Sequence, residues 1–319
     1  MSDKLRVFFL GSGEIAVPIL YALIAAPSLD LLGVATQPDR QAGRRRQLIS
    51  TPVGKAADLA QVGAERIENV NAPEFIARLR GLAPDIVLVV SFGQILRDEL
   101  LNLPEYGCVN VHASLLPKYR GASPIAAAIA NRDAMTGIAY MRMNRGLDTG
   151  DVFRILPLEL RGNESADALE FQLGLLAAGE LETTLCGIVD GTYPPRAQEE
   201  AAASKTKKIK KSDGLIDWRR SAADIEALLR AYHPWPGAHF NLLLEEGPLT
   251  ITVRRANVLS LDGGRPGEIL LADPKRGWIV ACGEGALELL EIVPTGRKAM
   301  PATAFLNGCR LDRAEVMVE

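Results

Sequence analysis

The chain has 319 residues, of which 48% are hydrophobic and 24% charged, and its formal net charge is −3. This composition is typical of a globular protein and excludes disordered and fibrous classes. Because the net charge is small, no global field attracts nucleic acid, and a polyanionic partner would have to bind local basic patches.

The cysteines, histidines and N-terminus bear on metal sites and location. The four cysteines are widely separated and form no Cys-x-x-Cys pair, and there are only three histidines. We therefore expect buried thiols in a reducing compartment, with neither disulfides nor a metal site. The first residues lack a signal-peptide pattern, and no apolar run approaches the roughly 18 residues of a membrane span. A cytoplasmic monomer without membrane contact is expected.

The first 190 residues alternate between apolar strands and helices. Residues 5–10 are a nearly continuous apolar run, typical of a strand covered on both faces. Further strands are predicted at 31–35, 86–90, 108–112, 136–143 and 152–156, and helices at about 16–24, 53–61, 73–82 and 166–189. This alternation predicts a doubly wound, mostly parallel Rossmann-like α/β domain over residues 1–190.

The first strand leads into Gly11-x-Gly13-x-x-Ala16, which fits the loose dinucleotide fingerprint. An NAD-dependent enzyme is therefore one alternative. The second strand should then end in an acidic residue that binds the ribose, but it continues into Thr36 and Gln37, and Asp39 lies beyond it. The glycines are explained more simply by a tight strand-to-helix turn, and the role of Glu14 stays open.

Residues 36–47 form a basic stretch without apolar periodicity, which predicts a loop after the second strand. It contains Arg40, Arg44, Arg45 and Arg46. Open sheets of this class place their sites at the carboxyl ends of strands. A run of charges is usually a solvated face, but clustered arginines among Gly, Pro and Gln also suit phosphate binding.

The strand at 108–112 carries the strongest chemical signal. Asn110 and His112 are two residues apart, so their side chains project from the same face. A carboxylate at Asp148, in a later loop, would hold the imidazole in one tautomer. The amide and imidazole can bind the oxygen that becomes negative when an amine attacks a carbonyl, while the His-Asp pair manages the proton. Each feature alone is more often structural, but together they predict acyl transfer.

The remaining residues predict a linker and a second domain. Residues 191–212 are rich in Pro, Ala and Lys, which indicates an interdomain linker whose lysines keep it soluble or contact a polyanion. The pattern Ser221-x-x-Asp224 predicts the start of a helix that runs to about residue 232. Short apolar stretches follow near 238–244, 249–256, 267–271, 277–281 and 287–293. Their spacing predicts a small, OB-like β-barrel over 213–319.

Three motifs in this order and spacing resemble the folate-dependent formyltransferases, and the resemblance covers almost the whole chain. They are Asn110-x-His112, the turn Ser114-Leu115-Leu116-Pro117-x-x-Arg120-Gly121, and Gly146-Leu147-Asp148-Thr149-Gly150-Asp151. The resemblance implies a Rossmann-like sheet that uses no dinucleotide, and formyl transfer from 10-formyltetrahydrofolate without a metal. It assigns catalysis to Asn110, His112 and Asp148.

The resemblance also implies where the folate and the acceptor bind. It places the folate against residues 91–96 and the turn that follows the catalytic strand, with contacts from Phe92, Ile95, Ser114, Leu115, Leu116 and Pro117. By composition alone, residues 91–96 are a strand end entering a helix. In members that act on initiator methionyl-tRNA, the basic loop matches an insertion that enters the acceptor end. This assigns tRNA contacts to Arg40, Arg44, Arg45 and Arg46, and the lysine linker adds Lys207 and Lys208.

Three other functions are weighed against formyl transfer to tRNA. An amino-sugar formyltransferase and a formyltetrahydrofolate hydrolase-type domain share the catalytic triplet. The Gly-Leu-Asp-Thr-Gly-Asp form disfavours the first, and the chain is much shorter than those in which the second usually occurs. A non-catalytic tRNA-binding protein on the same scaffold is disfavoured because Asn110, His112 and Asp148 are all present.

Overall fold

The computed structural model describes residues 4–42, 47–245, 247–261, 263–309, 311 and 315–316. The chain divides into two compact units. Unit 1 comprises Met1–Pro124, Met135–Glu159 and Ala168–Thr206; unit 2 comprises Ile125–Ala134, Leu160–Asp167 and Lys207–Glu319. Within the described ranges, no helix combines the length and apolarity needed to cross a membrane.

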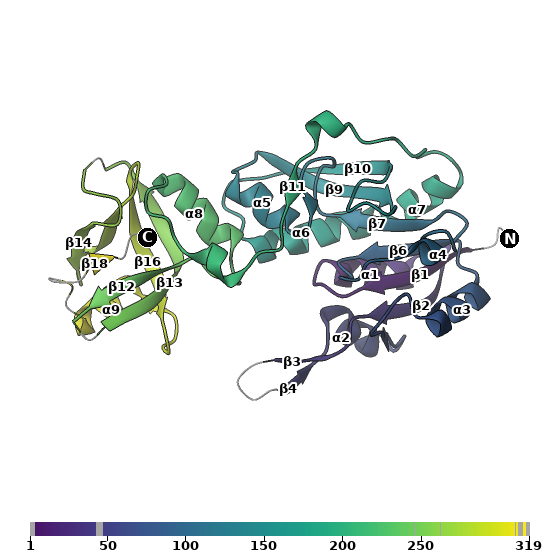
Figure 1. The fold of residues 1–319 in the computed structure, drawn as a ribbon, viewed down its shortest axis with the longest axis horizontal. Helices are drawn as coiled ribbons and strands as arrows, with labels where there is room; N and C mark the ends of the chain where they lie inside the picture. Colours follow the sequence, from purple (N-terminus) through teal and green to yellow (C-terminus); the bar gives the residue numbers. More distant parts are fainter. Residues whose placement is uncertain are drawn as a thin grey trace. The chain divides into compact units, whose positions relative to one another are not determined.

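Unit 1 is built on a seven-stranded sheet in the order β10-β9-β7-β6-β1-β2-β5 (Figure 1). The strands are β1 (Leu5–Gly11), β2 (Leu29–Thr36), β5 (Glu65–Arg66), β6 (Ile86–Val90), β7 (Cys108–His112), β9 (Met135–Arg142) and β10 (Val152–Glu159). Neighbours from β7 to β5 run parallel, and β9 is antiparallel to both β7 and β10. The predicted mostly parallel sheet is confirmed.

The sheet of unit 1 is covered by helices because its central strands are apolar on both faces. Phe8 and Val87 pack with Phe75 of the helix α3, while Val7 and Phe9, on the opposite face, are also fully buried. The helices are α1 (Ala16–Ala25), α2 (Pro52–Leu59), α3 (Pro73–Leu82), α4 (Asp98–Leu101), α6 (Ala166–Gly179) and α7 (Leu181–Val189). The helix predicted at 166–189 is therefore two helices, which meet at Glu180.

The strand order reverses between β1 and β6. The chain passes from β1 outward to β2 and β5, returns to β6 on the other side of β1, and continues to β7. In open α/β sheets, ligands bind beyond the carboxyl ends of the strands at such a reversal. The turns that follow β1 and β6, and the end of β7, therefore lie at the edge where a site is expected.

The basic stretch 36–47 differs from the predicted loop. Residues of β3 (Arg40–Ala42) pair antiparallel with β4 (Gln47–Ile49), so the segment is a small hairpin. Leu48 and Ile49 are exposed. A hairpin that does not bury one face shows no apolar alternation, which explains why the pattern predicted a loop. The predicted phosphate-binding residues Arg44, Arg45 and Arg46 lie outside the described residues.

Unit 2 contains a second, antiparallel sheet, as predicted for the β-barrel region. Its order is β14-β15-β16-β13-β12-β18, with β17 paired to β16. These strands are β12 (His239–Leu244), β13 (Gly247–Leu259), β14 (Ile269–Asp273), β15 (Gly277–Ala281), β16 (Ala286–Pro294), β17 (Met300–Pro301) and β18 (Glu315–Val316). In the ribbon the sheet curls into a half-barrel, with α8 (Ala222–Ala231) and α9 (Ala302–Gly308) packed against it (Figure 1).

Aromatic side chains fill the interior of this half-barrel. Phe240 contacts both Trp218 and Trp278 edge-on, with ring centroids 5.4 Å and 6.0 Å apart. Trp278 also stacks on Phe305 of α9. Both tryptophans are fully buried. A curled sheet closed over large rings can form an independent core at this size, because each such ring buries about 150–250 Å².

Candidate active site

The strand β7 presents Asn110 and His112 on one face, as predicted from their spacing. β7 is flanked by β6 and β9, with Asn110 opposite both Val89 and Met141. Asn110 is half-buried, and only 6% of the His112 surface is exposed. An amide and an imidazole are therefore held on rigid backbone in the middle of the sheet.

Asp148 reaches this face because its loop folds back over the sheet. β9 is antiparallel to β7, so it ends beside the start of β7, where Met143 N donates to Cys108 O. The chain then returns toward the middle of β7. Asp148 Oδ1 lies 3.5 Å from Asn110 Nδ2, and Asp148 Oδ2 lies 3.7 Å from His112 Nδ1. The structure thus brings together the three residues that were predicted to be catalytic.

The Asp148 carboxylate is oriented by a backbone donor from another segment. Gly121 N donates to Asp148 Oδ2 over 2.7 Å. Asp148 itself has φ of 54°, in the left-handed region that few residues other than glycine adopt. Such conformations persist where the surroundings fix them, and they gather at functional sites.

The hydrogen bonds of His112 determine its tautomer. Its Nε2 lies 3.0 Å from the main-chain oxygen of Tyr119. A carbonyl only accepts, so Nε2 carries a hydrogen. In the neutral ring, Nδ1 is then bare and faces the Asp148 carboxylate. A proton on Nδ1 makes that contact attractive, so this pair can hold a proton at Nδ1.

The chain matches known formyltransferases along nearly its whole length. A family model described as formyl transferase matches residues 4–174, and one described as formyl transferase, C-terminal domain, matches residues 208–310. The methionyl-tRNA formyltransferase of Geobacter metallireducens is 40% identical over 308 residues, 97% of each chain. That of Solibacter usitatus is 40% identical over 315 residues, 99% of each chain. The chain belongs to the methionyl-tRNA formyltransferase family.

A solved structure shows the same fold. HypX from Aquifex aeolicus, in complex with tetrahydrofolic acid, superposes on this formyltransferase with a TM-score of 0.61 at 16% identity. The match covers 98% of this chain and 48% of that chain. This formyltransferase therefore spans about half the length of HypX, and at this identity the likeness concerns the fold.

The turn after β7 is held by its own polar groups. The Ser114 hydroxyl is fully buried and donates to Lys118 O over 2.6 Å. Leu116 packs in a small core cluster with residues of β9 and β10. Leu115 and Pro117, by contrast, are half-buried. Of the four residues predicted to contact folate here, two are therefore partly accessible, while Ser114 and Leu116 support the turn from inside.

The segment after β6 separates the other two predicted folate contacts. Phe92 is 2% exposed and belongs to the core of unit 1, whereas Ile95 is 83% exposed. The structure does not bring these two side chains together. Phe92 O accepts from Gln37 Nε2 over 3.1 Å, and a Cβ at Gly13 would meet Ser91 Oγ at 2.5 Å. The turns after β1 and β6 therefore pack directly on each other, which explains Gly13 without a dinucleotide.

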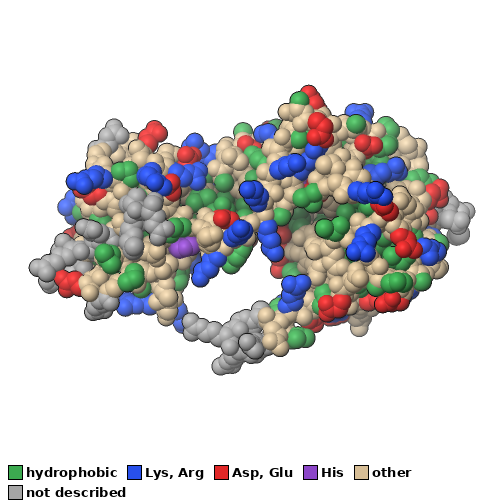
Figure 2. Space-filling view, viewed as in Figure 1, with side chains coloured by type: hydrophobic (Ala, Val, Ile, Leu, Met, Phe, Trp, Pro, Cys, Tyr) green, Lys and Arg blue, Asp and Glu red, His purple; other side chains and the backbone are tan. Residues whose placement is uncertain are grey.

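The described residues among the predicted tRNA contacts are exposed. Arg40 is exposed on the β3–β4 hairpin of unit 1, with Nη2 3.4 Å from Gln37 Oε1. Lys207 and Lys208, at the start of unit 2, are also exposed. Figure 2 shows the Lys and Arg side chains on one face of the molecule. Their cationic groups are available to solvent and hence to a charged ligand.

Sequence reasoning missed a group of polar residues that supports the site. Arg120 is 2% exposed; its Nε donates to Gln198 Oε1 over 2.9 Å, and its two terminal nitrogens donate to the two carboxylate oxygens of Glu200. These bonds lower the pKa of Glu200. Gln198 Nε2 donates in turn to the main-chain oxygens of Asp148 and Gly150. Apolar periodicity carries no signal for such contacts, and the stretch that supplies them was predicted to be a linker.

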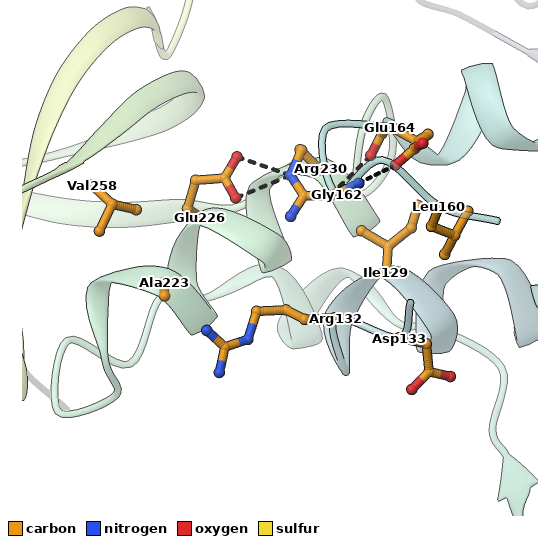
Figure 3. Close-up of a pocket in the computed structure, with 10 residues that line it drawn as sticks. All are labelled: Ile129, Arg132, Asp133, Leu160, Gly162, Glu164, Ala223, Glu226, Arg230 and Val258. Carbon is orange, nitrogen blue, oxygen red and sulfur yellow. Dashed lines mark hydrogen bonds and ion pairs between the residues drawn. The ribbon is translucent and has the colours of Figure 1, made fainter. Parts of the chain in front are cut away.

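A hollow with a volume of about 220 Å³ lies within unit 2, and two charged side chains of its wall, Arg230 and Glu226, are directed at each other (Figure 3). Arg230 Nε donates to Glu226 and its Nη1 to Glu164 O, while Arg132 forms an ion pair with Asp224. Both arginines are thus held by partners within unit 2.

Proposed function

We propose that this formyltransferase transfers the formyl group of 10-formyltetrahydrofolate to the free amino group of methionyl-initiator tRNA, as a cytoplasmic monomer that serves translation initiation. The observation that carries the proposal is the convergence of Asn110, His112 and Asp148 on one face of the sheet. The choice of methionyl-tRNA as the acceptor is supported by two relatives that are 40% identical over nearly the whole chain and are methionyl-tRNA formyltransferases.

Asn110 and His112 stabilise the charge that develops during formyl transfer. The uncharged amine attacks the formyl carbon, and negative charge develops on the formyl oxygen. The Asn110 carboxamide has a second N–H besides the one directed at Asp148, and this N–H stabilises that charge. His112 begins as the neutral ring with a bare Nδ1, and it becomes a second donor to the oxygen once Nδ1 has taken the proton of the amine. A donor of this kind typically contributes about 3 kcal/mol in the transition state.

Proton transfer completes the balance of the reaction. As the new N–C bond forms, the bond from the formyl carbon to the folate nitrogen breaks, and its electron pair goes to that nitrogen. The proton lost by the amine passes through His112 Nδ1, beside Asp148, to the departing folate nitrogen. Positioned proton transfer typically contributes about 10² to 10⁴-fold in rate.

The folate is proposed to lie against the turns that follow β6 and β7. The partly accessible Leu115 and Pro117 and the exposed Ile95 would contact its ring system, because binding sites for flat heterocycles are lined mainly by apolar groups. Ser114, Leu116 and Phe92 are buried, so they support this wall from behind.

The tRNA is proposed to contact both units. Arg40 of the hairpin, together with Arg44, Arg45 and Arg46, is assigned to the acceptor end. Lys207 and Lys208 are assigned to the phosphate backbone. Exposed Lys and Arg side chains bind phosphates mainly through charge and counterion release, so these contacts would add affinity without reading sequence. We also propose that residues 191–212 link a catalytic domain, residues 1–190, to the C-terminal domain, residues 213–319.

The decisive experiment offers one labelled formyl donor to three acceptors. Labelled 10-formyltetrahydrofolate is incubated separately with charged initiator tRNA, free methionine and an amino sugar, and the label is located by chromatography. We expect label on the charged tRNA alone. Label on the amino sugar would replace the proposal by sugar formylation, and label released as formate in every arm would replace it by hydrolysis.

A further inference from the structure

Residues 196–206, here named the strap, contact two segments of the candidate site. These are the turn that follows β7 and the loop that carries Asp148. Arg196 pairs with Val152 at the exit of the Asp148 loop through two main-chain hydrogen bonds. At its other end, β11 (Lys205–Thr206) pairs in parallel with β8 (Arg120–Gly121), directly after the turn that follows β7. All of these residues belong to unit 1. The strap therefore connects the turn with the loop.

Gln198, near the start of the strap, forms hydrogen bonds through both the oxygen and the nitrogen of its side-chain amide. Its Oε1 accepts from Arg120 Nε over 2.9 Å, and its Nε2 donates to Asp148 O over 2.9 Å and to Gly150 O over 2.7 Å. A guanidinium only donates and carbonyls only accept, so the orientation of the amide is fixed by its partners. A carboxylate in its place would lose both donors and would face two carbonyl oxygens.

Arg120 gives the amide a rigid support. Its side chain is 2% exposed, and its Nη atoms make a two-pronged contact with the Glu200 carboxylate at 3.0 Å and 2.8 Å. Such paired bonds fix the plane of a guanidinium. The next residue, Gly121, donates its N–H to Asp148 Oδ2. Asp148 is therefore held twice: its main chain is bound by Gln198 of the strap, and its carboxylate is bound by Gly121 of β8, the strand with which the strap pairs.

From this geometry we infer that Gln198 is a positioning residue for formyl transfer, which acts by fixing the Asp148 loop against His112. The inference rests on the proposed role of Asp148. Gln198 contacts the main chain of Asp148, so its loss moves the carboxylate without removing it. It should affect turnover, while the surfaces assigned to folate and tRNA keep their residues.

A double-mutant cycle with Asp148 tests the inference. The variants are Gln198→Glu, Asp148→Asn and the double variant, with Glu199→Ala at the exposed neighbouring position as the matched control. We expect Q198E to lower kcat at least about 10-fold, with KM for both substrates changed less than about 2-fold. In the D148N background it should cause little further loss, because both changes act through one carboxylate. E199A should behave as the wild type.

The opposite results would overturn the inference. A full additional loss from Q198E in the D148N background, or a rise in KM with unchanged kcat, would assign Gln198 a structural or binding role instead. If Q198E does not fold, as judged by circular dichroism, Gln198→Met keeps the length of the side chain and is measured in the same cycle. Each assay uses whichever amine the wild type formylates, so a wrong acceptor contradicts the proposed function while the cycle still tests Gln198.

Discussion

Gly121 donates its main-chain N–H to the carboxylate of Asp148, and this single bond of 2.7 Å joins two motifs that lie 27 positions apart in the sequence. A third segment, the strap, lies close to the residue that donates this bond. Gly121 has φ of 114°, and a Cβ at this position would lie 2.3 Å from Thr206 O. Glycine is therefore demanded here by both the backbone conformation and the strap that packs on it.

Asp148→Asn should separate catalysis from binding. The carboxamide oxygen can still accept from Gly121 N, so the loop should keep its geometry, while the negative charge that attracts a proton to His112 Nδ1 is lost. We expect kcat to fall by about 10² to 10⁴-fold. The Kd for charged tRNA, measured by filter binding, should stay within about 2-fold. Equal losses in turnover and affinity would contradict the assigned role.

Gly121→Ala should damage both stability and activity. The new methyl group would force the backbone of β8 away from Thr206 and pull the donor away from Asp148. We expect a destabilisation of roughly 1–3 kcal/mol and a loss of kcat of at least about 10-fold. Gly179→Ala is the matched control, because a Cβ at the end of α6 meets nothing within 4 Å. Wild-type kinetics for G121A would show that the approach of the strap does not position Asp148.

The predictable part of the fold is the part in which burial dictates residue type. β1 and β6 are buried on both faces, so their sequences are nearly continuous apolar runs. The predicted strands at 5–10 and 86–90 are confirmed. The hairpin of β3 and β4 exposes Leu48 and Ile49 and therefore has no diagnostic pattern. Local hydrogen bonding without burial is largely invisible to periodicity.

The same distinction applies to the site. Asn110 and His112 were predictable from the two-residue repeat of a strand, which decides the face of each side chain. The hydrogen bond between Arg120 and Gln198 was not predictable, because it depends on how the strap crosses the turn. No pattern of apolar residues indicates where the strap crosses. Polar contacts between distant segments become visible only when the chain is folded.

Replacing the strap-proximal lysines should change the salt dependence of tRNA binding. Each lysine that contacts a phosphate contributes roughly 0.7–0.9 to the slope of log K against log salt. We expect Lys207→Ala and Lys208→Ala each to reduce this slope by about that amount, with kcat at saturating tRNA unchanged. Lys275→Ala, an exposed lysine in the turn between β14 and β15, is the control. Unchanged slopes would exclude these lysines as phosphate contacts.

Ser221→Ala should destabilise unit 2 at the start of α8. The Ser221 hydroxyl accepts from Asp224 N over 3.1 Å, which confirms the helix start predicted from sequence. Loss of such a cap typically costs about 1 kcal/mol, while Ser221→Asp keeps an acceptor and should lose little. All three tryptophans lie in unit 2, so tryptophan fluorescence during urea unfolding reports on this unit. Equal midpoints for the Ala and Asp variants would contradict a capping role.

Glu164 should give unit 2 a pH-dependent contribution to stability. Its buried carboxylate is disfavoured by desolvation, but it accepts main-chain N–H bonds from Arg161, Gly162 and Asn163, and these together lower its pKa below the usual 4.5. A lowered pKa in the folded state means that the charged form stabilises folding. This contribution is complete above about pH 4.5 and is lost as the pH falls through the folded-state pKa.

The variant Glu164→Gln isolates that contribution. Its amide cannot accept all of these bonds, so at pH 7 we expect a loss of about 1.5–3 kcal/mol in urea unfolding followed by tryptophan fluorescence. The difference from wild type should stay constant down to about pH 5 and then shrink, because the wild-type carboxylate becomes protonated as well. Glu284→Gln, at an exposed position in unit 2, should show no such difference. If the difference in free energy of unfolding between wild type and E164Q widened in acid instead, the protonated carboxyl would be the stabilising form.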